Sequence, residues 1–469
     1  MPKGIARYLL YAAILLVAIT GFNEASDFGI GPVWIVLAAI LLPCLLIALV
    51  RFPAAFFVPV LFISRQMELP IPAPFRRIID VTALPLGVGL LGAAVILRLL
   101  ALRGRREASS IGDLFRNQGK GIVAFLLFAA MVTVSYLYTP APGYGSDKLV
   151  SFLTAGGLMF FAPFVLLTEE NDFRHFTITA VGFALALSAS RIMFTSQGSL
   201  AAHEHATHIG IGQLIGMAIL LVFVHRFAEG RAVRTLLILC IPALAVGMIA
   251  AEARGPILAL LLVFGVFLFT RRRETSLISR RTAMLGVAVI VVTLVILPAQ
   301  WFQGQAAATF QAKSRELVDF TQEGSYSDKG SGGRRLVFFK AALDGVAEKP
   351  IGGFGVGGWS TYYNSTDAWQ YPHNVVLEVA LEEGLLGLAL LAVFLAMAFK
   401  AAKKAFDDES GRFAFVLPVL AYCLLITMTS GDLDDARFLW FWCGVAFVTS
   451  RFIVSGRQEE TQAKTASVS

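Results

Sequence analysis

The sequence predicts an all-α polytopic membrane protein, with about 12–14 transmembrane helices and one large extramembrane loop. The first observation behind this prediction is the composition, because 57% of the 469 residues are hydrophobic and only 15% are charged. The second is that the apolar segments stay apolar over roughly 17–22 residues, the length that a spanning helix needs. The strands of a membrane barrel would instead alternate apolar and polar residues. The third is that residues 300–372 form one long hydrophilic interval.

Apolar runs follow one another along the chain, with short polar connections between most of them. They fall near residues 8–21, 31–50, 53–64, 80–98, 121–138, 150–167, 175–192, 208–227, 235–252, 255–270, 283–299, 374–399, 413–430 and 436–453. The run at 53–64 is short and could be a partial span. The first run follows a basic N-terminus, as in a signal sequence, but has no clear small-x-small cleavage site. We therefore interpret it as an uncleaved first helix.

Basic residues in the connections predict the orientation of the chain. Four clusters carry them: Arg103, Arg105, Arg106, Arg116 and Lys120; Arg226, Arg231 and Arg234; Arg271, Arg272, Arg273, Arg280 and Arg281; and Lys400, Lys403 and Lys404. Alternating the spans puts all four clusters on one side, which the positive-inside rule assigns to the cytoplasm. Arg76 and Arg77 are an exception and fall outside. The net charge of +7 therefore reflects membrane orientation and does not indicate nucleic-acid binding.

The outer face is then expected to carry several separate polar stretches. These are residues 300–372, the turn at 252–254, the loop at 197–208 and the acidic turn at 432–435. Both termini are expected in the cytoplasm. Because the outer stretches can converge on one non-cytoplasmic face, we expect a functional site there.

The predicted organisation has four parts. They are N-terminal transmembrane helices at 1–299, a loop domain at 300–372, C-terminal transmembrane helices at 373–455 and a disordered cytoplasmic tail at 456–469.

Within the loop domain, residues 306–320 and 335–347 are expected to be helices. The second has apolar residues at steps of three and four. The glycine-rich run 352–358 follows Pro350 and is expected to form a tight turn.

Three arginines are candidates for anion binding on the outer side. Arg254 opens a membrane helix directly after a turn, where free N–H groups and the helix dipole already attract anions. A guanidinium there can bind phosphate through a bidentate fork. A snorkelling interfacial arginine is the alternative interpretation. Arg334 and Arg335 begin the second loop helix, and a solvated or lipid-headgroup contact is their alternative role.

A polar cluster stands where the loop domain meets the next apolar helix. His373 titrates near neutrality, and it could act as a general base, as a phosphate hydrogen-bond donor or as a structural residue. Asn374, Glu378 and Glu382 are four residues apart, so they share one helix face. That face is expected to point into the bundle, because burying it against lipid would be costly. A capping or packing role for Glu378 stays open.

Two other polar groups could suggest a metal, but we expect none. His203, His205 and His208 lack both an i,i+4 spacing and a cysteine partner, so we interpret them as a polar rim of the cavity. The acidic turn at 432–435 could bind a divalent cation, but its position at a helix N-terminus explains it more simply. The chain also has no Walker motif, so any substrate must arrive already activated.

Several of these motifs together resemble the bacterial O-antigen ligase/polymerase superfamily. They are Arg335–Leu343, Pro350–Gly355, His373–Asn374 with Leu377–Glu378, and Glu383–Gly387, in the order in which that family has a loop arginine, a Pro-x-x-Gly-x-Gly turn and a His-Asn-x-x-Leu-Glu helix. Arg254 and Gly255 resemble the family's Ser-Arg-Gly element, although Ala253 replaces the serine. The resemblance covers roughly residues 205–400.

The resemblance implies a GT-C-like inverting glycosyltransferase of the bacterial inner membrane that needs no metal or other cofactor. Its donor would be a glycan on undecaprenyl diphosphate at the periplasmic face, and its acceptor would be lipid A-core or a growing glycan. Carried over, Arg254 and Arg335 would bind the diphosphate and stabilise its developing charge. His373 would be either the base or a diphosphate ligand. The predicted substrate-binding residues are Arg334, Asn374, Glu378, His205 and His208.

The leading interpretation is ligation of a finished O-antigen to lipid A-core. A polymerase that joins repeat units of O-antigen or exopolysaccharide uses the same donor, and transfer to protein hydroxyls is a third possibility. A secondary transporter would predict matching halves with interrupted helices, and the sequence shows no such repeat. A purely structural membrane protein would not need Arg254, Arg335 and His373 on one face.

Overall fold

The computed structural model describes residues 52–62, 83–102, 119–194, 205–224, 239–251, 254–270, 331–408 and 410–466. Its helices are α3 (Pro53–Phe62), α5 (Ala83–Leu102), α7 (Gly119–Ser135), α8 (Pro142–Ser151), α9 (Gly157–Leu166), α10 (Glu170–Phe194), α11 (His205–Val224), α13 (Ile241–Ala250), α14 (Arg254–Thr270), α17 (Ser331–Glu348), α18 (Gly358–Asn364), α19 (Val375–Glu382), α20 (Gly384–Asp407), α21 (Val416–Ser430) and α22 (Arg437–Ala466). A 3-10 turn, η1 (Tyr136–Tyr138), follows α7, and a π-helical turn, η2 (Phe152–Gly156), joins α8 to α9. Within the described ranges every regular element is a helix, which confirms the all-α prediction.

Three of the described helical segments are long and apolar enough to cross a membrane, judged by length and composition. They are Gly119–Tyr138, Pro142–Leu166 and Gly384–Asp407. Each overlaps a run that the sequence predicted as a span, so the described helices are long enough for the membrane class that the composition predicts. The expected total of about 12–14 spans includes runs outside the described residues and stays a prediction.

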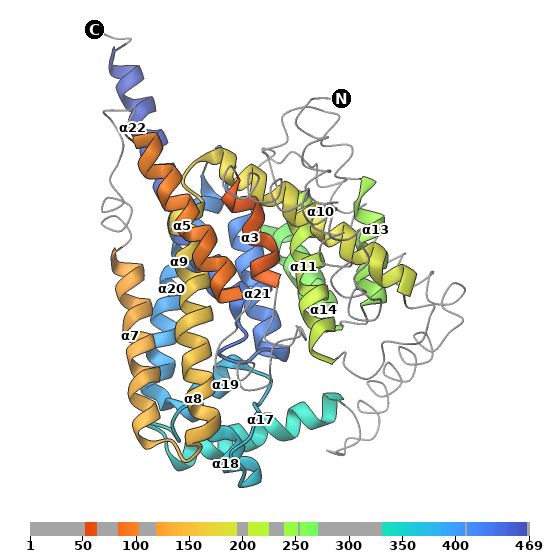
Figure 1. Cartoon of the computed structure of the whole chain (residues 1–469), viewed down its shortest axis with the longest axis vertical. Coiled ribbons are helices and arrows are strands. Elements are labelled where there is room, and N and C mark those ends of the chain that lie inside the picture. The colour runs from red at the N-terminus through yellow and green to blue at the C-terminus, as the bar shows by residue number, and fades with distance from the viewer. Residues whose placement is uncertain are drawn as a thin grey trace, which may run out of the picture.

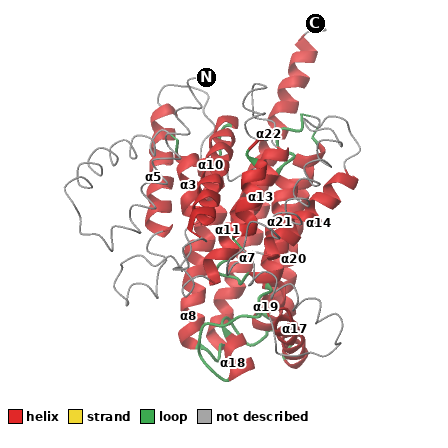
Figure 2. Ribbon diagram, turned by 90° about the vertical axis from the view of Figure 1, so that its right-hand side faces the viewer, coloured by secondary structure: helices red, strands yellow, loops and turns green. Residues whose placement is uncertain are grey.

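The long helices run side by side, and the loop helices cover one end of them. Figure 1 shows α7, α9 and α20 running lengthwise, with α17 lying across the lower end of the bundle beside α18 and α19. Figure 2 places α17 and α18 at the same end in the perpendicular view. The C-terminal end of α22 projects at the opposite end in both views.

Aromatic side chains fill the core between the long helices. Phe125 of α7 stacks on Phe160 of α9 with 4.1 Å between ring centroids, and Phe160 packs edge-on against Phe394 of α20 at 5.5 Å. Gly444 of α22 allows a close approach to α9, because a Cβ there would lie 2.4 Å from the carbonyl oxygen of Phe160. Small residues at such crossings are typical of packed membrane helices.

The glycine-rich run forms the predicted tight turn, and it packs against the end of α19. Gly353, Gly355 and Gly357 have φ values of 69°, 90° and 76°, in the region that favours glycine. The amides of Phe354 and Gly355 donate to the carbonyl oxygens of Leu381 and Glu382 at 2.9 and 2.7 Å. The turn therefore binds carbonyl groups at the C-terminal end of α19 that the helix itself leaves unsatisfied.

Two predicted segments differ in the structure. The apolar run 374–399 is not one helix, because Gly384 adopts a φ of 70° and separates α19 from α20. The amide of Leu385 donates to the carbonyl oxygen of Pro350 at 2.7 Å, which holds the break in place. The second difference is at the end of the chain, where α22 continues to Ala466 although a disordered tail was expected from residue 456. Glu, Gln, Lys and Ala dominate this stretch and favour extension of an existing helix.

Some predicted features lie outside the described residues. These are the first helix at 8–21, the runs at 31–50 and 283–299, the loop helix at 306–320, the basic clusters at 103–116, 226–234 and 271–281, Arg76 and Arg77, the turn residues 252–253 and the loop at 197–204.

Candidate functional site

Arg335 connects the loop domain to the membrane helices. It lies half-buried on α17, and its Nη2 donates to Ser430 Oγ at 3.2 Å, at the end of α21. Ser430 also adjoins the start of α14, because a Cβ added to Gly255 would lie 3.5 Å from Ser430 Oγ. Arg254 is the first residue of α14, as predicted. The end of α21 therefore brings the first turn of α14 and the first turns of α17 together.

The electrostatics of Arg335 place Arg254 and Tyr371 near it. Burial lowers the pKa of the Arg335 guanidinium, the nearby Tyr371 opposes this shift, and the charge of Arg254 adds to it. Burial also raises the pKa of Tyr371, and the carboxylates of Asp432 and Asp435 act in the same direction. Because the charge of Arg254 disfavours the charged form of Arg335, an anion bound near Arg335 would be stabilised.

His373 lies in the same region with an unusual backbone conformation. Its φ is 58°, which a non-glycine residue rarely adopts without support from its surroundings. Its ring lies parallel to that of Phe338, with 6.0 Å between centroids and an interplanar angle of 9°. The ring of Tyr371 meets it edge-on at 4.5 Å. Among the described residues, no partner forms a hydrogen bond with the buried Nδ1 of His373.

Burial lowers the pKa of His373 to about 4, and the charges of Arg335 and then Arg334 contribute to the shift. The imidazole is therefore neutral at neutral pH, with one nitrogen able to donate and one able to accept a hydrogen bond. Both roles that the sequence left open, base and phosphate ligand, are compatible with this state. Arg334 itself is exposed at the start of α17.

Asn374 caps the helix that carries the glutamates. Its Oδ1 accepts hydrogen bonds from the amides of Val376 and Leu377 at 3.0 and 3.1 Å. This is the N-cap geometry that fixes the first residue of a helix. The structure thus assigns Asn374 a capping contact, and its expected contact with substrate stays a prediction.

Glu378 and Glu382 point toward a lysine that the sequence analysis did not single out. Lys148 of α8 has its Nζ in a salt bridge with Glu378 Oε1 and 2.6 Å from Glu382 Oε2. All three side chains have 0% exposure. The expectation that this face of α19 points into the bundle is therefore confirmed. The contact that the structure shows for Glu378 is the one between its Oε1 and Lys148. Its role in substrate binding stays a prediction.

Lys148 was not singled out in the sequence analysis, because this residue precedes the predicted apolar run. The sequence predicted an apolar run at 150–167, which leaves Lys148 in the preceding connection. In the structure α8 begins at Pro142, so Lys148 lies inside a continuous helical segment from Pro142 to Leu166. Proline favours the first position of a helix, and Pro142 was the signal that could have moved the helix start forward.

The acidic turn lies near the same cluster. Asp432 and Asp434 are 3% and 4% exposed, and Asp432 Oδ1 accepts a hydrogen bond from the Asp435 amide at 2.9 Å. Burial raises the pKa of Asp432, and the carboxylates of Asp434 and Glu378 act in the same direction. Among the described residues, no group of three or more His, Cys, Asp or Glu side chains is arranged to hold a metal ion.

His205 and His208 lie in the first turn of α11. Their side chains are outside the described part of the structure, so their expected contact with substrate stays a prediction.

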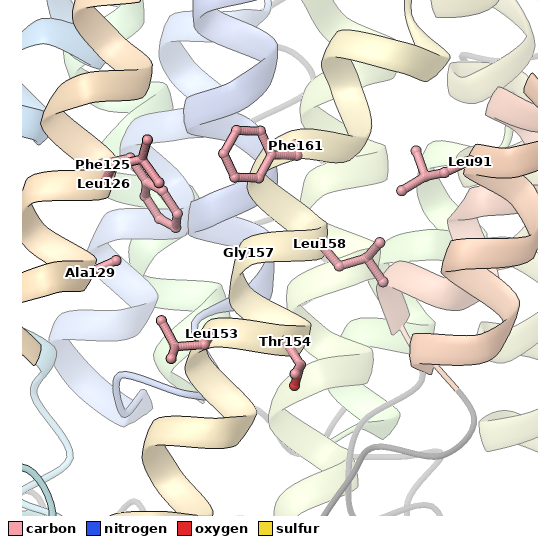
Figure 3. A pocket seen from close by; sticks show the side chains of 9 residues that line it. All are labelled: Leu91, Phe125, Leu126, Ala129, Leu153, Thr154, Gly157, Leu158 and Phe161. Carbon is pink, nitrogen blue, oxygen red and sulfur yellow. The ribbon is translucent and has the colours of Figure 1, made fainter. Parts of the chain in front are cut away.

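A cavity of about 330 Å³ lies between α5, α7 and the η2–α9 segment, and none of these polar groups lines it. Figure 3 shows Phe125, Leu126 and Ala129 on one side and Leu153, Leu158 and Phe161 on the other. Thr154 contributes a hydroxyl group, and none of the described residues that line the cavity is charged. The cavity therefore lacks the cations that a diphosphate needs, and the candidate site is the cluster around Arg335 and His373.

A comparison with protein families identifies the part of the chain that carries this cluster. Residues 235–392 match the family model described as O-Antigen ligase. This part of the chain is therefore similar to an O-antigen ligase domain. The match covers about a third of the chain, and no curated protein matches the chain.

The matched residues include Arg254, Arg335 and His373, the three residues that the sequence predicted to be catalytic. Lys148 and Ser430 lie outside the matched residues. Because Lys148 binds Glu378 and Ser430 binds Arg335, helices on both sides of the matched residues complete the surroundings of the candidate site. Members of this family are glycosyltransferase-like ligases and polymerases.

Proposed function

We propose that this protein is a membrane glycosyltransferase that transfers a glycan from undecaprenyl diphosphate to a sugar acceptor at the periplasmic face. The specific reaction that we propose is ligation of O-antigen to lipid A-core. The observation that carries the proposal is that Arg335 binds Ser430, which adjoins Gly255, and interacts electrostatically with both Arg254 and His373. All three candidate residues fall within the part of the chain that matches an O-antigen ligase.

The two arginines have the chemistry for the donor's diphosphate. Burial and mutual repulsion both destabilise the charge on Arg335, and a diphosphate between the two guanidinium groups would relieve this repulsion. A guanidinium binds phosphate oxygens through two parallel hydrogen bonds. Cations held in place before the reaction also stabilise the charge that develops on the leaving diphosphate.

The transfer itself needs one bond to form and one to break. The acceptor hydroxyl oxygen attacks the anomeric carbon of the donor sugar, and the bond from that carbon to the diphosphate oxygen breaks. Undecaprenyl diphosphate leaves with the bonding electrons, and the configuration at the carbon inverts. The hydroxyl proton is transferred to His373 in our proposal, because its neutral imidazole can accept a proton.

Donor binding would make His373 a better base. Arg335 and Arg334 hold the pKa of His373 down, and the negative diphosphate would offset their charge. The pKa of His373 would then rise toward its ordinary value of about 6.5 only when the donor is bound. This coupling would limit activation of the acceptor to the complex that contains donor.

The proposed orientation puts α17 in the periplasm. The C-terminal end of α22 lies at the opposite end of the helical bundle from α17 (Figure 1). With α17 in the periplasm, a cytoplasmic C-terminus follows, in agreement with the orientation that the basic residues predict.

A polymerase that joins repeat units is the alternative function, because the matched family includes ligases and polymerases. The experiment that separates the two functions is a lipopolysaccharide gel of a strain that lacks this protein. Loss of the whole ladder, with polymer accumulating on undecaprenyl diphosphate, is expected for a ligase. Core carrying a single repeat unit would identify a polymerase, and an unchanged ladder would contradict both assignments to O-antigen.

Complementation then tests the site. Arg335→Ala is expected not to restore the ladder, whereas Lys340→Ala, an exposed change on the same helix, is expected to restore it. Full restoration by Arg335→Ala would remove Arg335 from the proposed site.

A further inference from the structure

Two separate contacts tie α8 to the segment that carries His373. At the start of α8, the amides of Gly143 and Tyr144 donate to the carboxylate oxygens of Asp367 at 2.7 and 2.8 Å. Further along α8, Lys148 binds Glu378 and Glu382. Because Asp367 precedes His373 and Glu378 follows it, α8 holds the chain on both sides of the histidine.

The lysine contact is the buried one of the two. Lys148, Glu378 and Glu382 all have 0% exposure, and Trp359 of α18 also donates its amide to Glu382 Oε1 at 3.4 Å. A charged group that is fully buried and paired in a membrane protein is costly to build, and such groups usually serve a site. Hydrophobic side chains of similar volume would pack α8 against α19 without this cost.

His373 needs such support because of its backbone. A φ of 58° is unfavourable for histidine and persists only when neighbouring contacts enforce it. The Asn374 cap fixes the first turn of α19 to the residue after His373. Any displacement of α19 would therefore be transmitted through Asn374 to the imidazole.

We propose that Lys148 is a positioning residue, which places α19, and through it His373, for glycan transfer by binding Glu378 and Glu382. This proposal rests on the proposed function. Lys148 does not touch the reacting atoms in this mechanism, and it acts through the position of the helix.

The test compares three full-length variants purified in lipid nanodiscs. Lys148→Met alone leaves two buried carboxylates without their cation and can fail to fold. The informative variant is therefore Lys148→Met combined with Glu378→Gln and Glu382→Gln, which removes all three charges at similar side-chain lengths. Lys148→Arg keeps the positive charge. Lys340→Met is the matched control, because Lys340 is an exposed lysine on α17 with 75% side-chain exposure.

The kinetic result that we expect is a change in kcat and not in KM. The triple variant should unfold thermally at a midpoint close to that of the wild type, with kcat lowered about 10²-fold by the misplaced histidine. The KM for the lipid-linked donor should stay within about twofold. Lys148→Arg should recover most of kcat. A raised donor KM with unchanged kcat would overturn the proposal, because it would mean that Glu378 binds substrate directly.

A second measurement does not depend on activity. Diethylpyrocarbonate modifies neutral histidine side chains, and mass spectrometry of the peptide that contains His373 gives the rate. We expect modification several-fold faster in the folded triple variant than in the wild type and in Lys340→Met. An unchanged rate in a folded triple variant would overturn the proposal, even if kcat fell. If the wild type transfers no glycan but the rate still rises, the proposed function fails and the positioning of His373 by Lys148 stands.

Discussion

Arg335 Nη2 on the helix α17 lies 3.2 Å from Ser430 Oγ at the end of the apolar helix α21. This hydrogen bond is a direct link between the candidate catalytic arginine and the apolar helices of the bundle. It also sets the distance between Arg335 and the first turn of α14, because Ser430 adjoins Gly255. Variants at Ser430 therefore test the geometry of the site without removing a charge.

Ser430→Ala is expected to weaken donor binding. The substitution removes one hydrogen bond that the charged Arg335 guanidinium donates, and such a bond contributes roughly 1.5–3 kcal/mol. The KM for the lipid-linked glycan should therefore rise by roughly ten- to a hundredfold. Steady-state kinetics with a lipid-linked donor measure this effect. Ser430→Thr keeps the hydroxyl group and should retain most of the affinity. Equal KM values for Ser430→Ala and the wild type would show that the contact does not orient Arg335 for the donor.

The pH dependence of transfer should reflect His373. Since burial and two arginines lower its pKa to about 4 in the protein without donor, kcat/KM should stay level as the pH falls to about 5 and then decrease. The acidic decrease of kcat should occur at a higher pH than the decrease of kcat/KM, because the diphosphate offsets the charge of the arginines in the complex. His373→Gln should lack both limbs. A limb of kcat/KM near pH 6.5, the ordinary value for histidine, would contradict the burial of His373.

The same shift predicts how stability changes with pH. Between about pH 6.5 and pH 4, the unfolded chain binds a proton at His373 that the folded protein does not. The folded protein should therefore lose stability as the pH falls through this window, and His373→Gln should lose less. Thermal midpoints of the two proteins at pH 7 and pH 5 measure the difference. An identical decrease in both proteins would mean that other groups account for the acid sensitivity.

Asn374→Ala should destabilise the start of α19. The side chain accepts two backbone hydrogen bonds there, and loss of such a cap costs about 1 kcal/mol. The thermal midpoint should fall by a few degrees, and transfer activity should fall because His373 is the preceding residue. Asn374→Asp keeps an acceptor oxygen for the cap and serves as the control. If both variants lost activity at unchanged midpoint, a direct contact of the amide with substrate would explain the result better.

Gly353→Ala should disrupt the turn that packs against α19. A Cβ at Gly353 would lie 2.4 Å from the carbonyl oxygen of Leu381, and φ is +69°. We expect destabilisation of about 1–3 kcal/mol, measured as a lower thermal midpoint. Gly352→Ala is the matched control, because the nearest atom to its Cβ would be the Tyr138 hydroxyl at 3.6 Å, an ordinary contact. Equal midpoints for the two variants would contradict the described turn.

The sequence was a good guide wherever local rules decide the structure. The apolar periodicity after Arg335 predicted α17, and the glycines after Pro350 predicted a turn that the structure contains. Propensity and periodicity act over a few residues, so such elements can be recognised without tertiary contacts. The sequence did not predict the break at Gly384, because an isolated glycine in an apolar run is also tolerated inside helices.

By itself, the sequence determined the helical membrane class of this protein, and its motifs named Arg254, Arg335 and His373 as candidates. These conclusions depend on composition, on segment length and on the order of motifs along the chain. Only the tertiary structure decided that Ser430 binds Arg335 and that Lys148 binds Glu378 and Glu382. Lys148 and Glu378 are 230 residues apart in sequence, so no local pattern relates them. The choice of partner for a buried charge depends on which helices pack together, and this is a property of the folded bundle.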